Sequence, residues 1–95
     1  MLGRITRAGV NKVTVRGVDG SHRDYALTAG SIVIGRDPAS GIPLKDSQVS
    51  WKHAVLITDA NGCIIEDLGS SNGTFVGPHR IQRHVVHPGE RIKIG

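Results

Sequence analysis

Glycine and proline divide this chain into short segments, because 13 glycines and four prolines are spread over 95 residues. No apolar pattern between them keeps helical spacing for three turns, and the segments are rich in residues typical of strands. Asp-Gly or Asn-Gly pairs at 19–20, 61–62 and 72–73 favour tight hairpin turns. Many short strands at such spacing predict an all-β sandwich or barrel. The expected strands are 13–16, 23–27, 31–34, 53–58, 63–66, 74–76, 80–82 and 91–94.

The size and composition of the chain exclude several classes of protein. A chain of 95 residues makes one domain, which excludes a two-domain enzyme with an interdomain cleft. Aromatic residues make up only 3%, so Val, Ile, Leu and Ala are expected to form the core. The single cysteine, Cys63, excludes an internal disulfide and is expected to be buried. No stretch approaches the roughly 18 apolar residues of a spanning helix, so we expect a soluble cytoplasmic domain without a membrane partner.

The positive charge of the chain is concentrated at its N-terminus. Residues 1–16 carry four basic and no acidic side chains, whereas residues 17–95 carry eight of each. We therefore expect a basic N-terminal arm over residues 1–12, either poorly ordered or an added edge strand, followed by the domain proper over residues 13–95. A nucleic-acid surface needs cations gathered on one face of the folded body, so nucleic acid is not the expected partner.

Two longer segments are rich in groups that bind anions. The first runs from Gly35 to His53 and includes Arg36 and Ser50, and the second runs from Asp67 to Thr74. Loops at one end of a sandwich cluster, so these segments are expected to meet. A guanidinium beside several hydroxyls describes a receptor for a phosphate ester, because arginine offers a planar fork to two phosphate oxygens.

These residues also carry a family resemblance. Gly35-Arg36, then Ser50-x-x-His53, then the block Asp67–Val76 (DLGSSNGTFV), resemble the forkhead-associated (FHA) domain in order and spacing. The resemblance implies an FHA-like β-sandwich of about 10–11 short strands whose loops at one end bind a phosphothreonine peptide. It implies a binding module without a cofactor, whose partners are phosphothreonine-containing proteins, that is, a Ser/Thr kinase or its substrate.

The resemblance also implies a role for each motif residue. Arg36, Ser50 and Ser71 would hold the phosphate, and Asn72 would bond the peptide main chain just after the phosphothreonine. Lys52 would add positive charge beside the peptide. The residues expected to shape and fasten the loops are Gly35, His53 and Gly73.

The chain departs from the family pattern at three places. Trp51 follows the motif serine where Arg or Asn is common, and it either packs on the peptide or obstructs it. Gly77-Pro78 stands where the family usually has Asn-Gly. The chain ends at Ile92–Gly95, where the family continues into one further strand that pairs near the first. We therefore expect that strand to be missing and its edge to be covered by the N-terminal dozen residues or by another chain, with self-association as one outcome.

Alternative functions have weaker support in the sequence. Residues 69–73 fit the G-x-S-x-G pattern of hydrolases, but a strand rather than the required helix is expected to follow. Ser50 and His53 lack a nearby acid, so no enzyme is expected. The spacing of His79, His84 and His87 is loosely ligand-like, but no Cys or acid completes a metal site. The remaining alternative is an interaction domain of the same fold that does not depend on phosphate.

Overall fold

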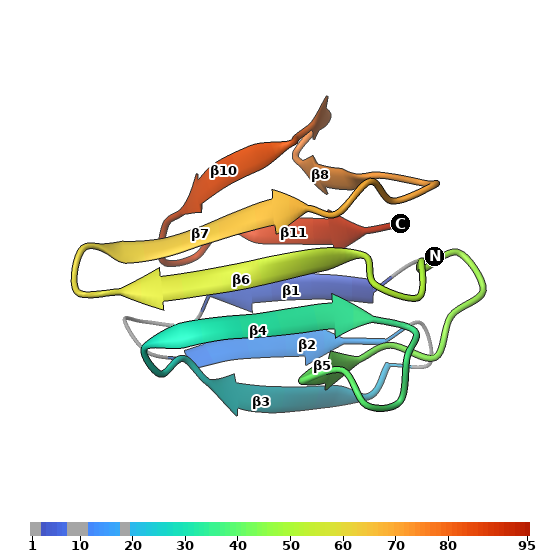
Figure 1. Ribbon diagram of the computed structural model, residues 1–95, viewed down its shortest axis with the longest axis horizontal. Coiled ribbons are helices and arrows are strands. Elements are labelled where there is room, and N and C mark those ends of the chain that lie inside the picture. Colours follow the sequence, from blue (N-terminus) through green and yellow to red (C-terminus); the bar gives the residue numbers. More distant parts are fainter. Residues whose placement is uncertain (1–2, 8–11, 18–19) are drawn as a thin grey trace.

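The computed structural model describes residues 3–7, 12–17 and 20–95. Two β-sheets pack face to face as a sandwich (Figure 1), which confirms the predicted fold class. The strands are β1 (Gly3–Arg7), β2 (Lys12–Arg16), β3 (His22–Ala26), β4 (Gly30–Gly35), β5 (Ile42–Pro43), β6 (Ala54–Asp59), β7 (Gly62–Asp67), β8 (Thr74–Val76), β9 (His79–Arg80), β10 (Arg83–Val86) and β11 (Arg91–Ile94).

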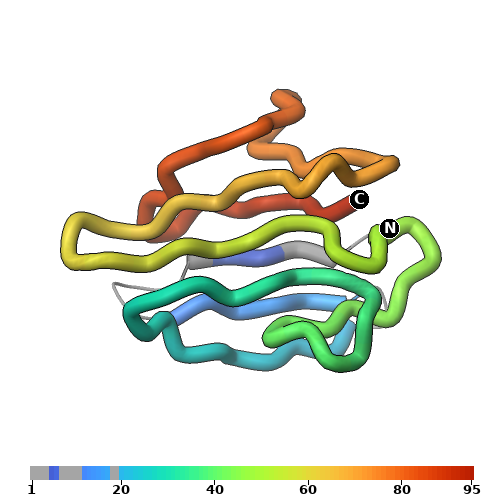
Figure 2. Tube along the Cα trace, viewed as in Figure 1, coloured from blue at the N-terminus to red at the C-terminus, as the bar shows by residue number. Residues whose placement is uncertain are grey.

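The order of the strands determines which loops share an end of the molecule. One sheet has the order β3-β2-β1-β11-β8-β9 and the other has the order β10-β7-β6-β4-β5. All neighbouring strands are antiparallel except the pair of β4 and β5. The loop after β4, the loop before β6 and the loop after β7 therefore lie at the same end, on the right in Figures 1 and 2.

Aliphatic side chains fill the space between the sheets, as predicted. Buried and exposed positions alternate along β2 and β11, since successive side chains of a strand point to opposite faces. Cys63 is fully buried, whereas Trp51 is 51% exposed. The fully buried aliphatic residues are Ile5, Val13, Ile34, Ile42, Ala54, Leu56, Ile65, Val86, Ile92 and Ile94.

The N-terminal segment differs from the expected arm. Residues Gly3–Arg7 form β1, which lies inside the six-stranded sheet between β2 and β11 rather than at an edge. Ile5 pairs with Val15 on one side and with Ile92 on the other, and its side chain is fully buried. The strand neighbour that the family resemblance placed after Ile94 is thus provided by the opposite end of the chain. Residues 1–2 and 8–11 of the expected arm lie outside the described residues.

Three strands are missing from the predicted set: β1, β5 and β10. β5 is only two residues long and contains Pro43, which has no N–H to donate and is tolerated at the edge of a sheet. β10 lies at the other edge and has the sequence RHVV, so its two apolar residues are adjacent and show no alternating pattern. Asp19 of the predicted Asp19-Gly20 turn lies outside the described residues. No helix able to cross a membrane occurs in the described part of the chain.

Candidate functional site

A shallow cavity of about 300 Å³ opens at the end of the sandwich where the loops after β4, before β6 and after β7 meet. The two segments singled out in the sequence both contribute to it. The residues around it include Arg36, Gln48, Ser50, Trp51, Ser71 and Asn72. Five of these six were expected to contact the phosphate or the peptide, and Gln48 was not.

Arg36 is exposed at this cavity and is held from two sides. Its Nε donates a hydrogen bond to the carbonyl oxygen of Val49 at 3.1 Å. Its guanidinium carbon lies 5.4 Å from the centroid of the Trp51 ring, within the range of a cation–π contact. Asp37 is bonded to Lys52 instead, and no described carboxylate forms an ion pair with Arg36. The guanidinium is therefore oriented without its charge being neutralised.

Ser50 joins the two loops directly. Its Oγ accepts a hydrogen bond from the backbone N–H of Ser71 at 3.1 Å. The backbone N–H of Arg36 in turn donates to the carbonyl oxygen of Ser50 at 3.0 Å. The structure thus brings the arginine, the first serine and the backbone of the second serine to one place, although 35 positions separate Arg36 from Ser71 in the sequence.

Asn72 adds a second connection between the loops. Its side-chain Nδ2 donates to the carbonyl oxygen of Gln48 at 2.9 Å. An asparagine amide has two donor hydrogens and an acceptor oxygen, so this contact does not exhaust its capacity. The contact turns the Asn72 side chain toward the loop before β6, and Asn72 also borders the cavity.

His53 lies fully buried beneath the site and fastens both loops. Its Nδ1 accepts the backbone N–H of Ser50 at 3.0 Å, and its Nε2 lies 2.7 Å from the carbonyl oxygen of Gly73. An N–H can only donate and a carbonyl oxygen can only accept. The ring is therefore the neutral tautomer with hydrogen on Nε2.

Gly35 and Gly73 stand where a larger residue does not fit. A Cβ on Gly35 would lie 2.2 Å from the carbonyl oxygen of Trp51, so the two backbones are packed against each other. Gly73 has φ of +90°, and a Cβ there would lie 2.8 Å from Nε of Arg80. Both glycines allow the loops to approach their neighbours closely.

Asp67 organises the second loop, a role that the sequence interpretation did not assign. Its carboxylate accepts hydrogen bonds from the backbone N–H groups of Gly69 and Ser70 and from the hydroxyls of Ser70 and Thr74. Partial burial alone would raise the pKa of Asp67, but these hydrogen bonds outweigh it and hold the pKa below its ordinary value of 3.8. The signal in the sequence is Asp-x-Gly-Ser, a pattern typical of a turn closed by an Asp side chain.

Lys52 is the one expected contact residue that does not border the cavity. Its Nζ lies 3.7 Å from a carboxylate oxygen of Asp37, and the lysine side chain is largely exposed. Trp51, by contrast, borders the cavity and stacks on Arg36. The tryptophan thus orients the guanidinium from the rim of the site.

Comparison with known proteins identifies the family. The sequence model of the FHA domain family matches residues 32–95 of this chain. This chain belongs to the FHA domain family. The FHA domain-containing protein FhaA of Mycobacterium tuberculosis is 36% identical over 83 residues, which are 87% of this chain and 16% of FhaA. The transcriptional regulatory protein EmbR of the same organism is 39% identical over 75 residues, which are 78% of this chain and 19% of EmbR.

Solved FHA domains share the fold. A domain from a study of phosphothreonine-dependent FHA domain interactions has a TM-score of 0.79 and 36% identity, and the match covers 88% of each chain. The FhaA FHA domain, solved in complex with the intracellular domain of Rv3910, has a TM-score of 0.78 and 35% identity, and the match covers 86% of this chain and 90% of that one. This FHA domain spans less than a fifth of the length of FhaA and of EmbR.

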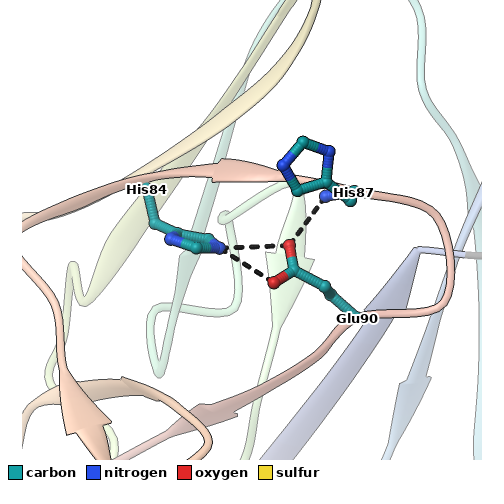
Figure 3. A network of polar contacts seen from close by, with 3 residues as sticks. All are labelled: His84, His87 and Glu90. Carbon is teal, nitrogen blue, oxygen red and sulfur yellow. Dashed lines mark hydrogen bonds and ion pairs between the residues drawn. The ribbon is translucent and has the colours of Figure 1, made fainter.

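Outside the site, two of the histidines singled out in the sequence, His84 and His87, are hydrogen-bonded to Glu90. Nε2 of His84 lies 3.0 Å from both carboxylate oxygens of Glu90, and the backbone N–H of His87 donates to Glu90 at 2.7 Å (Figure 3). The His87 hydrogen bond, followed by His84, holds the pKa of Glu90 below its ordinary value despite some desolvation. Glu90 is an acid near these histidines that the sequence interpretation overlooked. Glu90 closes the turn between β10 and β11. No group of three or more metal-binding side chains occurs among the described residues.

Proposed function

We propose that this FHA domain binds phosphothreonine peptides and thereby mediates protein–protein contacts that depend on a Ser/Thr kinase. The observation that carries the proposal is the junction of Ser50 Oγ with the Ser71 N–H beside an arginine that no described acid neutralises. A phosphate ester has three acceptor oxygens and a charge of about −1.5 to −2. The junction offers donors of the required kind at one point.

Each group has a distinct part in the proposed complex. The guanidinium of Arg36 donates to two phosphate oxygens, while its Nε remains bonded to Val49. The hydroxyl of Ser50 donates a hydrogen bond to a phosphate oxygen, while its oxygen continues to accept the hydrogen bond from the Ser71 N–H. The hydroxyl of Ser71 completes the set, and the amide of Asn72 bonds the main chain after the phosphothreonine.

The buried histidine argues for binding rather than catalysis. Both ring nitrogens of His53 are bonded to backbone groups, so neither is available to take a proton from the Ser50 hydroxyl. Ser71 is followed by β8 rather than by the helix that a hydrolase nucleophile turn requires. The domain therefore binds phosphopeptides without catalytic activity. It acts in the cytoplasm, where the kinase phosphorylates the proteins that the domain binds.

A peptide array tests the proposal. The domain is titrated with phosphothreonine peptides of varied sequence and with phosphoserine and unphosphorylated copies of each. We expect capture of the phosphothreonine forms only. Arg36→Ala and Ser50→Ala should each weaken capture about 10- to 150-fold, since a hydrogen bond to a charged group contributes about 1.5–3 kcal/mol.

Two controls separate binding from folding. Both variants should melt within a few degrees of the native domain, because Arg36 is exposed and Ser50 is only partly buried. Arg36→Lys keeps the charge but not the fork, so it should restore only part of the affinity. Equal capture of phosphorylated and unphosphorylated peptides would overturn the proposal in favour of an interaction domain that does not depend on phosphate.

A further inference from the structure

A second and larger cavity, of about 460 Å³, opens between the free edges of the two sheets. β3 is the edge strand of one sheet and β5 is the edge strand of the other. The inner wall is apolar, since it includes Val15 and Leu44, which are 6% and 8% exposed. Its volume falls within the range of about 300–1,000 Å³ that is usual for ligand sites.

The register of β3 directs two large side chains into this cavity. Arg23 pairs with Val15, and Tyr25 pairs with Val13. Side chains directly opposite each other on neighbouring strands point to the same face, and both valines face the core. Arg23 and Tyr25 therefore point between the sheets, where the guanidinium carbon lies 5.7 Å from the centroid of the tyrosine ring.

Among the described residues that border this cavity, the charged side chains are basic. Arg23, Lys45 and His22 border it, and no acid is among the described residues that do. Two described acids that are near in the sequence, Asp24 and Asp46, are engaged elsewhere. Asp24 is bonded to Thr14 and Lys12 on the outer face of the sheet, and Asp46 accepts the backbone N–H of Gln48. An apolar recess whose described rim is basic favours an apolar side chain within an acidic segment.

The sheet order places this cavity beside the phosphate site, on the side away from Asn72. Asn72 follows β7, Ser50 precedes β6 and Arg36 follows β4, while the second cavity lies at β5. These strands are neighbours in the order β7-β6-β4-β5, and the loops at issue share one end of the sandwich (Figure 1). A peptide that crosses this end with its main chain at Asn72 after the phosphothreonine directs its preceding residues toward β5.

We propose that this second cavity, bordered by Arg23, Tyr25 and Lys45, binds the segment that precedes the phosphothreonine and selects an apolar side chain flanked by acidic residues. The inference rests on the proposed function. Neighbouring strands are about 4.8 Å apart and an extended peptide rises about 3.4 Å per residue. One or two strand spacings thus place the apolar anchor about one to three residues before the phosphothreonine.

Fluorescence anisotropy with matched peptides tests this inference. All peptides share one sequence from the phosphothreonine onward, and the preceding six residues are either Gly/Ser or Asp/Glu with one leucine at each position in turn. The acidic peptide with leucine at the best position should bind about tenfold more tightly than the Gly/Ser peptide, a difference of about 1.4 kcal/mol.

Charge reversal assigns the effect to this cavity. Lys45→Glu and Arg23→Glu should each remove most of the tenfold difference and leave the affinity for the Gly/Ser phosphopeptide within about twofold. Arg91→Glu changes the net charge equally, and Arg91 is exposed on β11 and does not border the cavity. It should preserve the difference.

The outcomes distinguish a failure of this inference from a failure of the proposed function on which it rests. If no phosphopeptide is preferred over its unphosphorylated copy, the proposed function fails and this inference fails with it. If phosphopeptides bind but the preceding residues make no difference, only this inference is overturned. The same holds if Lys45→Glu and Arg23→Glu leave the tenfold difference intact, because Arg23 would then serve only as the inward charge that protects an edge strand.

Discussion

At the scale of single residues, two side chains that need not touch a ligand hold the binding loops in place. His53 bonds the backbone on either side of the site, at Ser50 and Gly73. The Asp67 carboxylate accepts hydrogen bonds from backbone and hydroxyl groups of its own loop. The Oγ of Ser70, one of these groups, in turn accepts a hydrogen bond from the Gly73 N–H. The positions of Ser50, Ser71 and Asn72 therefore depend on buried or half-buried polar groups whose hydrogen bonds lie within the protein.

The hydrogen bonds to Asp67 make the second loop sensitive to acid. Because the pKa of the folded carboxylate lies below 3.8, its stabilising effect is present at neutral pH and is lost as the pH falls below that value. We expect Asp67→Asn to lower the free energy of unfolding at pH 7 by about 2 kcal/mol. Thermal melts between pH 2 and pH 7 measure this, and the two proteins should converge at the acidic end. A difference that stays constant over the whole range would contradict this role for Asp67.

At the scale of strands and loops, the site depends on a close approach between the end of β4 and the loop before β6. The carbonyl oxygen of Trp51 lies against Gly35 and also accepts the backbone N–H of Asp37 at 3.2 Å. The backbone N–H of His53 donates to the carbonyl oxygen of Ile34 at 2.8 Å. These contacts fix the loop before β6 on the end of β4, directly before Arg36.

Gly35→Ala should therefore disturb both stability and binding. The added methyl group would meet backbone atoms of Trp51, so we expect a loss of about 2–3 kcal/mol and weaker capture of phosphothreonine peptides. Gly77→Ala is the matched control, because Gly77 has φ of +57° and nothing lies within 4 Å of its added Cβ. It should lose about 1 kcal/mol from backbone strain and leave binding unchanged. Comparable effects of the two variants on binding would contradict this view of Gly35.

The sequence predicted these elements unevenly, for physical reasons. The hairpin of β6 and β7 was predictable, because a turn pair lies between two apolar segments. The predicted turn was one residue off, since the two-residue loop is Ala60-Asn61 and Gly62 already belongs to β7. The meeting of Arg36 with Ser50 and Ser71 followed from the motif spacing and the sandwich architecture. The parts played by Asp67 and Gln48 did not follow, since they depend on which backbone groups the folded loops present to each other. β5 and β10 escaped prediction because both are short edge strands with little apolar pattern.

At the scale of the whole molecule, the N-terminal strand completes one sheet. The sequence predicted a poorly ordered arm or an added edge strand for this segment, but β1 has neighbours on both sides. Its one buried aliphatic residue, Ile5, packs into the core between the sheets. Among the described strands, β1 is the one that joins β2 to β11 in this sheet.

Ile5→Ala distinguishes an interior strand from an arm. Removing a buried isoleucine side chain should cost about 2–5 kcal/mol, and it should lower the melting temperature by about 10 °C or more. Thr6→Ala is the matched control, because Thr6 points to the opposite face and is only partly buried, so its effect should stay near 0.5 kcal/mol. Equal and small effects of both substitutions would show that β1 does not belong to the folded sheet.

The most direct test of the proposed phosphate site is an NMR titration of the isotope-labelled domain with one phosphothreonine peptide and its unphosphorylated copy. We expect the signals of the Arg36 Nε–H, the Ser50 amide and the Ser71 amide to shift together and to saturate at one peptide per domain. The unphosphorylated copy should leave all three signals unchanged. Equal shifts with both peptides, or shifts confined to strands remote from these loops, would contradict the claim that the two loops form one phosphate receptor.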